Sequence, residues 1–545
     1  MKKSFTIMLV LMILLTSFTG CVKKTDSNDA NVQTSGKSSE KPVQSTKEVS
    51  NFNPVGLPIV NEKITLKMMG SRHSAQGPWE DTIVMKWLEE ETNIHMDVYS
   101  VPSDVYAEKK NLAFASGDLP DIFFKATLSV KDEEAYGSQN LLVSLNDLIP
   151  KYAPNFSKIL KEKPHVKKAI SSIEGKIYSL PYVYYTNSMA NVRYINTKWL
   201  ENVGMKIPET IDDFYQALKA FKDMDPNGNN QKDEIPMTDV NIGGASFYLL
   251  PAFGFVTSAG NRWDAKDNKA VYIPLQNEYK EFIIYMRKLY SEGLLDQNIF
   301  THKTAELDAK LGEYRVGVMN DSLAKIPEEK QDEYRVLPPL TSHLNSQKMT
   351  YLIPGYVTGT YAITNKNKYP EASMRWVDLF YSEPKDAING ICGFTMFRGK
   401  EGEHWVYEND ERTLFSHIPL PDGKSGDYYL SPFRNGGAPM YITSALSNKN
   451  SLLSTRIKVE GSAEHYFPYM NRVGYPGLRY TEDENEKKNS IEDELGKYVS
   501  QMEVKFILGE EPIENWDAFI ERIKSIGIDE VIKIRQTALD RWNSF

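Results

Sequence analysis

Alternating hydrophobic and polar residues mark the start of the folded part of the chain. Hydrophobic side chains occupy every second position over 64–68 and again over 94–98, as in strands with one buried face. Hydrophobic residues at helical spacing follow Pro78, residues 106–115 predict a second helix, and 121–124 predict a third strand. This alternation of strands and helices indicates a largely parallel α/β layer.

Ligands bind such layers beyond the carboxyl ends of the strands, which places residues 70–79 and 124–126 near a predicted cleft. Further along, residues 182–185 are a predicted crossover into a second lobe. We expect a helix over 208–221 capped by Thr210. Other helices are predicted over 278–290, ending near Gly293, and over 368–381, 491–508, 516–526 and 531–542.

An oxygen-rich loop follows the helix predicted over 208–221. Its side chains alternate oxygen donors with residues that turn sharply, as in loops that wrap Ca²⁺. One arrangement starts at Asp223, as in an EF-hand, with Gly228 at position 6 and Glu234 at position 12. The other, which we favour because Asn230 can adopt the left-handed turn, uses Asp225, Asn227, Asn229, the Gln231 carbonyl, Asp233 and Glu234. Pro236 prevents an immediate exit helix, and the predicted calcium ion is structural.

The first residues have the pattern of an export signal. Lys2 and Lys3 precede an apolar run over 5–15, which is too short to span roughly 30 Å of hydrocarbon. Small residues then lead to Cys21, which is how bacterial lipoprotein signal peptides look. In that class of proteins the cysteine becomes the lipidated first residue, so we expect Cys21 to carry acyl chains such as palmitate and to hold the protein at the membrane.

Composition supports this interpretation. The chain has 545 residues and two cysteines, and if Cys21 carries lipid then Cys392 has no disulfide partner. Residues 22–60 are rich in Ser, Lys, Thr, Asn and Gln, which predicts a flexible tether. The roughly 485 residues that follow suit two or three core-forming units. A net charge of -9 argues against a nucleic-acid partner.

Six short segments, in order along the chain, resemble the family 1 extracellular solute-binding proteins, in the lipoprotein branch found in bacilli and paenibacilli. They cover nearly the whole mature chain. The segments are residues 117–122, 175–181, 194–200, 220–234, 289–295 and 505–509.

The resemblance implies an α/β protein of two lobes, with hinge crossovers and a ligand cleft between the lobes. It also implies an ATP-driven (ABC) importer as partner and no catalytic residues. A similar calcium loop occurs in alginate-binding relatives, in the arrangement favoured here, although Asn230 stands where those relatives usually have Gly. We expect a monomer divided into a signal peptide (1–20), a lipidated tether (21–60), lobe 1 (61–184 and about 355–412) and lobe 2 (185–354 and about 413–545).

A carbohydrate is the ligand class that the aromatic content favours. Sugar rings stack their C–H faces on aromatic planes, and the chain contains 31 Tyr. A guanidinium can bind a carboxylate through two hydrogen bonds, which would suit an oligosaccharide with uronic acid. The residues predicted to contact ligand are Trp79, Phe124, Tyr184, Tyr185, Trp263, Tyr356, Trp405, Phe433 and Arg434.

Two other functions stay open at the level of sequence. A lipoprotein that binds peptides, or that delivers a ligand to a sensor, would have the same binding fold. A surface glycosidase needs two carboxylates about 5 to 10 Å apart, and Asp and Glu are abundant here. The chain lacks the zinc-protease, nucleophile-elbow and phosphate-loop motifs, so an enzyme is the weaker alternative.

Overall fold

A computed structural model of the protein describes residues 51–184, 192–258, 260–320, 323–423, 425–442, 447–449, 451–470 and 472–544. The predicted signal peptide, Cys21 and the candidate ligand residue Tyr185 lie outside these residues. The folded unit begins at Asn51.

The predicted tether therefore ends before residue 60. Ile59 and Val60 are buried in the core of the first lobe, and Val60 forms a β-bridge with Phe52. Arg375 donates hydrogen bonds of 2.6 Å to the carbonyls of Pro54 and Gly56. These contacts hold the end of the predicted tether against the first lobe. In the sequence, the hydrophobic pair 59–60 marks the point where the polar composition of the tether stops.

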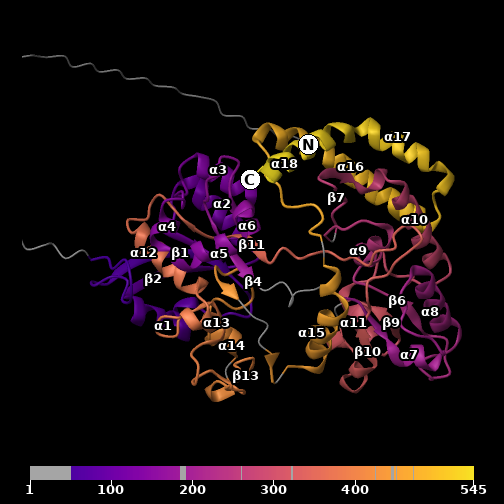
Figure 1. The fold of residues 1–545 in the computed structure, drawn as a ribbon, viewed down its shortest axis with the longest axis horizontal. Helices are drawn as coiled ribbons and strands as arrows, with labels where there is room; N and C mark the ends of the chain where they lie inside the picture. Colours follow the sequence, from indigo (N-terminus) through magenta and orange to yellow (C-terminus); the bar gives the residue numbers. More distant parts are fainter. Residues whose placement is uncertain are drawn as a thin grey trace, which may run out of the picture. The chain divides into compact units, whose positions relative to one another are not determined.

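The first lobe is built on a six-stranded sheet with the order β14-β4-β11-β3-β1-β2 (Figure 1). β1 pairs in parallel with β2 and β3, which confirms the predicted parallel layer, and β14 is parallel to β4. β11 runs antiparallel to both β3 and β4. The strands are β1 (Ile64–Arg72), β2 (Ile94–Pro102), β3 (Ile122–Phe124), β4 (Leu180–Tyr184), β11 (Tyr356–Ile363) and β14 (Tyr441–Ile442).

Helices surround this sheet, and two of them connect parallel strands as predicted. α1 links β1 to β2, and α2 links β2 to β3. The helices of this lobe are α1 (Ile83–Thr92), α2 (Tyr106–Ser116), α3 (Val130–Ser138), α4 (Leu148–Tyr152), α5 (Pro154–Glu162), α6 (Pro164–Ile170), α12 (Pro370–Asp378), α13 (Gly393–Arg398) and α14 (Gly426–Tyr429). A small sheet of β12 (Trp405–Tyr407), β13 (Leu414–His417) and β15 (Ser447–Asn448) lies outside the main one.

The second lobe contains a four-stranded sheet with the order β10-β5-β9-β6 and a separate hairpin, β7–β8. The C-terminal helices pack on this lobe: α16 lies against α10, and α18 against α16 and β8 (Figure 1). The strands are β5 (Tyr194–Asn196), β6 (Ile235–Met237), β7 (Trp263–Lys266), β8 (Lys269–Tyr272), β9 (Val316–Met319) and β10 (Tyr334–Val336). The helices are α7 (Thr197–Asn202), α8 (Ile211–Asp223), α9 (Ile242–Leu249), α10 (Asn277–Ser291), α11 (Thr304–Gly312), α15 (Leu453–His465), α16 (Glu482–Leu508), α17 (Trp516–Ile526) and α18 (Ile528–Ser544).

Two large hydrophobic cores, one in each lobe, share no residue. Phe433, Ala438 and Met440 belong to the core of the first lobe, and β14 belongs to its sheet. Lobe 1 therefore extends to Ile442, beyond the predicted boundary at 412, because residues 430–442 supply apolar side chains to its sheet face.

Helix bounds follow the predicted periodicity closely, with one clear difference. α16 begins at Glu482, earlier than the predicted residue 491. The first turns carry many charged residues, so hydrophobic periodicity does not reveal them. A capping box between Thr481 and Glu484 starts the helix instead. No helix in the described part of the chain is long and apolar enough to cross a membrane.

The N-cap of α8 offers a test of the fold. Thr210 accepts a hydrogen bond from the backbone N–H of Asp213 at 3.0 Å, and Asp213 accepts one in return from Thr210. We expect Thr210→Ala to lower the free energy of unfolding by about 1 kcal/mol in denaturant titrations, and Thr210→Ser to restore most of it. Equal stability of the two variants would show that the cap contributes nothing.

Candidate functional site: a pocket where the chain crosses between the lobes

Three strands of the first lobe have an end on the side of the sheet where the chain crosses between the lobes. β4 ends at Tyr184, and β11 begins at Tyr356 and runs in the opposite direction. Because the two strands run in opposite directions, the end of β4 and the start of β11 lie on the same side of the sheet. Val183 pairs with Tyr356 on one side and with Tyr441 on the other. Aromatic residues from three strands therefore gather at this edge.

A cavity of about 630 Å³ lies there, lined by residues of both lobes. We call it the crossover pocket. Its first-lobe lining is Lys163, His165, Tyr184, Tyr356 and Tyr441; the connecting segments contribute Leu352, Ile353, Pro354, Gly355, Val473, Gly474 and Pro476; and the second lobe contributes Ala265, Asn268, Leu539, Trp542 and Asn543.

The tyrosines of this edge keep their phenol protons. Burial, followed by the proximity of Tyr351 and Tyr184, raises the pKa of Tyr356 to about 12. Burial also raises the pKa of Tyr184 and of Tyr351 above their ordinary value. Within the described part of the chain, these three hydroxyls form no hydrogen bond, so those of Tyr184 and Tyr356, which line the pocket, are available to donate to a ligand and to accept from it.

Basic groups stand beside the aromatic rings. The His165 ring centroid lies 6.0 Å from that of Tyr356, and the ammonium of Lys163 lies 5.9 Å from the ring centroid of Tyr441. Burial, and then Lys163, lowers the pKa of His165, so its neutral form is favoured at neutral pH. Aromatic faces, hydroxyls, an imidazole and two Asn amides together can bind a polar ligand that also has apolar C–H faces.

The structure brings two of the predicted ligand residues, Tyr184 and Tyr356, into this pocket. It places five others in hydrophobic cores instead. Trp79, Phe124 and Phe433 are fully buried in the core of the first lobe, Trp263 lies in that of the second, and Trp405 packs with Phe394 and Phe415 beside the small sheet.

The predicted Arg434 lies on the first lobe away from the crossover pocket. Its Nε donates to Asp427 at 2.6 Å, and its guanidinium lies 4.9 Å from the ring centroid of Phe397. The Nε atom of Arg434 is therefore already bound to Asp427, and binding of a ligand carboxylate by the other guanidinium nitrogens stays a prediction.

Sequence reasoning missed three residues that line the pocket, namely Tyr441, His165 and Trp542. Tyr441 follows a run that contains two glycines and a proline, which is typical of a loop rather than of a strand. Trp542 is near the end of an amphipathic helix, where a core position is the usual interpretation. Tyr441 reaches the pocket because β14 pairs with β4, and hydrophobic patterning does not report which strands pair.

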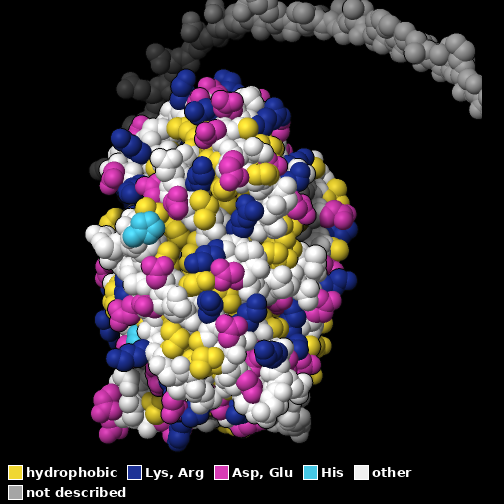
Figure 2. Space-filling model, turned by 90° about the vertical axis from the view of Figure 1, so that its right-hand side faces the viewer, with side chains coloured by type: hydrophobic (Ala, Val, Ile, Leu, Met, Phe, Trp, Pro, Cys, Tyr) yellow, Lys and Arg dark blue, Asp and Glu magenta, His cyan; other side chains and the backbone are white. Residues whose placement is uncertain are grey.

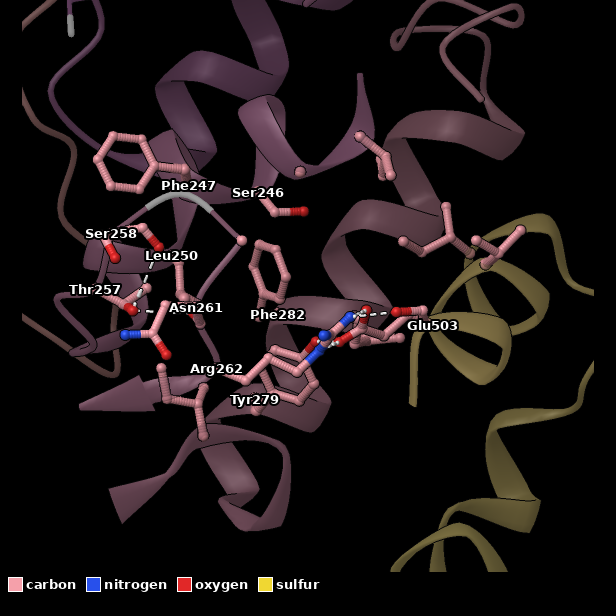
Figure 3. A pocket seen from close by; sticks show the side chains of 18 residues that line it. Ser246, Phe247, Leu250, Thr257, Ser258, Asn261, Arg262, Tyr279, Phe282 and Glu503 are labelled. Carbon is pink, nitrogen blue, oxygen red and sulfur yellow. Dashed lines mark hydrogen bonds and ion pairs between the residues drawn. The ribbon is translucent and has the colours of Figure 1, made fainter. Parts of the chain in front are cut away.

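A second, smaller cavity of about 190 Å³ lies entirely within the second lobe (Figure 3). Its apolar side includes Phe247, Leu250 and Phe282. At one end Arg262 forms two hydrogen bonds of 2.9 and 2.6 Å with Glu503, and the hydroxyl of Tyr279 also donates to Glu503. These polar groups satisfy one another, so this cavity offers fewer free polar groups to a ligand with many hydroxyls than the crossover pocket does.

The loop over 225–234 is folded around its own carboxylates. Asp225 Oδ1 accepts hydrogen bonds from the N–H groups of Gly228 and Asn229, and Oδ2 accepts one from Asn230 at 2.9 Å. Asp233 Oδ1 accepts from the side-chain amides of Asn227 and Asn229 at 3.3 and 3.1 Å. Asn230 has the predicted left-handed conformation, with φ 62°.

Glu234 is the residue that indicates a missing partner in this loop. Its Oε1 is buried and has no hydrogen-bond partner. Burial first, and then the carboxylates of Asp225 and Asp233, raises the pKa of Glu234. A divalent cation would relieve both the repulsion and the unpaired oxygen, so these residues fit calcium. Among the described residues no three His, Cys, Asp or Glu side chains alone form a metal-binding group, so Asn and carbonyl oxygens would have to complete the set.

Comparison with known families decides what kind of protein this pocket belongs to. The family described as "Bacterial extracellular solute-binding protein" matches residues 71–387. The chain belongs to this family.

Three curated relatives of this solute-binding protein align over most of their length. The fructooligosaccharide ABC transporter substrate-binding protein FusA of Streptococcus pneumoniae serotype 4 is 28% identical over 89% of this chain and 92% of its own. Lipoprotein LipO of Bacillus subtilis is 24% identical, covering 86% and 91%. The polygalacturonan/rhamnogalacturonan-binding protein YtcQ of the same species is 24% identical, covering 87% and 91%.

Solved structures confirm the two-lobed substrate-binding fold that was predicted for this solute-binding protein. FusA in complex with kestose superposes with a TM-score of 0.68 at 26% identity, over 88% of this chain and 100% of the other. An EF-hand mutant of FusA with fructo-nystose gives 0.67 over the same shares.

Proposed function

We propose that this protein captures an oligosaccharide in the crossover pocket and passes it, chemically intact, to an ABC importer in the membrane. The main support is the pocket itself, where Tyr184, Tyr356 and Trp542 present aromatic surfaces beside unpaired hydroxyls. FusA and YtcQ, which are named for oligosaccharide and polysaccharide binding, add support from sequence.

The lining of the pocket also favours binding without cleavage. No Asp or Glu occurs among the described residues that line it. Glycoside hydrolysis requires two carboxylates at the scissile bond. Family membership points the same way, because the family is defined by solute binding.

Oligosaccharide binding is tested by calorimetry and thermal unfolding with pools of oligosaccharides and of peptides. We expect an oligosaccharide to raise the melting temperature, and chromatography to recover it unchanged. Tyr356→Ala and Trp542→Ala should each weaken binding about tenfold or more, because a stacked ring contributes roughly 1.4 kcal/mol.

Tyr99→Ala is the matched control, because Tyr99 is 56% exposed on β2 and does not line the crossover pocket. Turnover of the sugar would contradict the transport proposal. Stabilisation by peptides alone would favour a peptide-binding lipoprotein instead.

We further propose that the loop over 225–234 binds structural calcium through Asp225, Asn227, Asn229, the Gln231 carbonyl, Asp233 and Glu234. The support is the unpaired Glu234 oxygen and the crowding of carboxylates around it. Asp223, the first ligand of the alternative arrangement, is the last residue of α8 and is exposed.

Chelation should therefore destabilise the protein. At calcium about 100-fold above its dissociation constant, the bound ion adds about 2.7 kcal/mol to the free energy of unfolding, and EGTA should remove this amount. Asp233→Ala should abolish the response to EGTA, whereas Asp97→Ala, at an exposed position on β2, should retain it. An unchanged melting temperature of the unmodified protein in EGTA would rule out the site.

We propose finally that Cys21 carries the lipid that holds the protein on the outer side of the membrane. LipO, a relative named as a lipoprotein, supports this. Cells fed a palmitate analogue should label the unmodified protein, and Cys21→Ala should lose the label and release the protein into the medium. Cys392→Ala, which removes the buried free cysteine, should keep the label. Retention of label by Cys21→Ala would contradict the anchor.

A further inference from the structure

Four basic side chains gather where β1 and β3 end in the first lobe. Arg72 ends β1, Lys125 follows β3, Arg398 ends α13, and Arg434 lies in the loop after α14. We call this group the basic edge. It occupies the carboxyl-end side of the parallel strands, where α/β layers bind ligands.

Hydrogen bonds through Gln76 hold three members of the basic edge together. Arg72 donates to the Gln76 carbonyl at 3.0 Å, and the Gln76 side-chain amide donates to the Arg434 carbonyl at 3.0 Å. Lys125 Nζ also donates to the Arg434 carbonyl at 3.0 Å. The side chains of Arg72 and Lys125 are thus held by neutral carbonyl groups, which leave their positive charge uncompensated.

Lys125 shows the cost of this arrangement. It is 4% exposed, its backbone adopts φ 51°, and burial lowers its pKa to about 8. A buried ammonium is normally paired with a carboxylate, but no described Asp or Glu forms an ion pair with Lys125. The same holds for Arg72 and Arg398; of the four, only Arg434 has a carboxylate partner, the half-exposed Asp427 at 2.6 Å.

Arg398 has unused donors. Its guanidinium is packed among rings, with its carbon 4.0, 4.8 and 5.2 Å from the centroids of Phe394, Phe415 and Phe397. Its Nε and Nη1 atoms are buried and have no hydrogen-bond partner. Arg434 approaches the Phe397 ring as well, at 4.9 Å, so two guanidiniums share one aromatic side chain.

Neighbouring groups respond to the concentrated positive charge. Burial first, and then Arg434, lowers the pKa of Arg398 to about 10. Burial, followed by Arg398 and Arg434, lowers the pKa of the exposed His417. By contrast, the face of the protein drawn in Figure 2 intersperses Lys and Arg with Asp and Glu, with no gathering of one sign.

A row of tyrosines connects the basic edge to the crossover pocket. Tyr182 lies close enough to Arg398 to affect its titration, and the Tyr182 ring centroid is 5.2 Å from that of Tyr184, which lines the pocket. Two aromatic rings of β4, those of Tyr184 and Tyr182, therefore lie between the lining of the crossover pocket and the surroundings of Arg398.

We propose that the basic edge binds the carboxylate of a hexuronate unit, so that the oligosaccharide this protein captures is acidic. A carboxylate supplies the missing counter-charge and accepts hydrogen bonds from adjacent guanidinium nitrogens. This inference rests on the proposed oligosaccharide function and specifies its substrate class.

The test compares two ligands with the same skeleton, an oligogalacturonate and its fully methyl-esterified form, by calorimetry at low and high salt. The acid should bind at least about tenfold tighter at low salt, and the difference should shrink as salt screens the charges. Arg398→Gln should remove the preference for the acid while leaving affinity for the ester nearly unchanged. Arg434→Gln should also reduce the preference for the acid, so this second variant tests the proposal if Arg398→Gln fails to fold.

Arg412→Gln is the matched control, since Arg412 is an exposed arginine bound to Glu401 and should keep the preference. Equal affinity for acid and ester, or a preference that survives both variants, overturns the basic edge as a carboxylate site but leaves oligosaccharide binding intact. Binding of neither ligand, nor of any neutral oligosaccharide, defeats the proposed function itself. If sulfate or phosphate ions alone stabilise the protein as much as the acid does, and Arg398→Gln abolishes this, the edge is an inorganic-anion site and the hexuronate assignment fails.

Discussion

The antiparallel direction of β11 is the constraint on which the crossover pocket depends. A parallel strand would begin at the opposite edge of the sheet, far from the end of β4. The register between β11 and β4 shifts between Val357 and Tyr361, and Gly359 lies in this shifted stretch with φ 69°. A Cβ on Gly359 would stand 2.0 Å from the Leu128 carbonyl oxygen, so only glycine permits this close approach.

The other wall of the pocket depends on a buried ion pair that joins the C-terminal region to the first lobe. Arg479, in the segment before α16, binds Glu133 of α3 at 2.5 Å, and Ser179 also donates to Glu133. Both charged side chains are nearly inaccessible to solvent. Breaking such a pair by removing one partner costs about 3–5 kcal/mol, because the other charge remains buried. The pair therefore fixes where residues 473–476 lie against the strands of the first lobe.

Periodicity predicted most helices and the parallel strands because each of these elements buries one face. The same physics explains why several of the residues predicted to contact ligand are buried in hydrophobic cores. Trp79 and Phe433, in segments that follow β1 and α14, each pack edge-on against Phe124, at centroid distances of 5.5 and 5.0 Å, since large apolar rings gain stability from burial in a core. Tyr184 and Tyr356 line the pocket because they stand at the end of β4 and the start of β11, where the two antiparallel strands meet the connection between the lobes. Sequence alone does not distinguish an aromatic residue buried in a core from one that lines the pocket, because it shows neither the direction of a strand nor which part of the sheet a loop covers.

Net charge gives a misleading picture of what this protein can bind. At -9 the chain as a whole repels anions, yet its first lobe concentrates four cations around one carboxylate. Salt screens exposed charges beyond about 8 Å at physiological ionic strength, so distant acidic residues affect a bound ligand little. Groups in direct contact are screened far less, because they lie among apolar rings and not in water. The loop over 225–234 has the opposite arrangement, since its three carboxylates form no ion pair with a basic side chain in the part of the chain that the structure describes. The first lobe and the loop over 225–234 thus carry local charge of opposite sign on one negatively charged chain, and in each the charged side chains lack enough partners of opposite charge among the described residues.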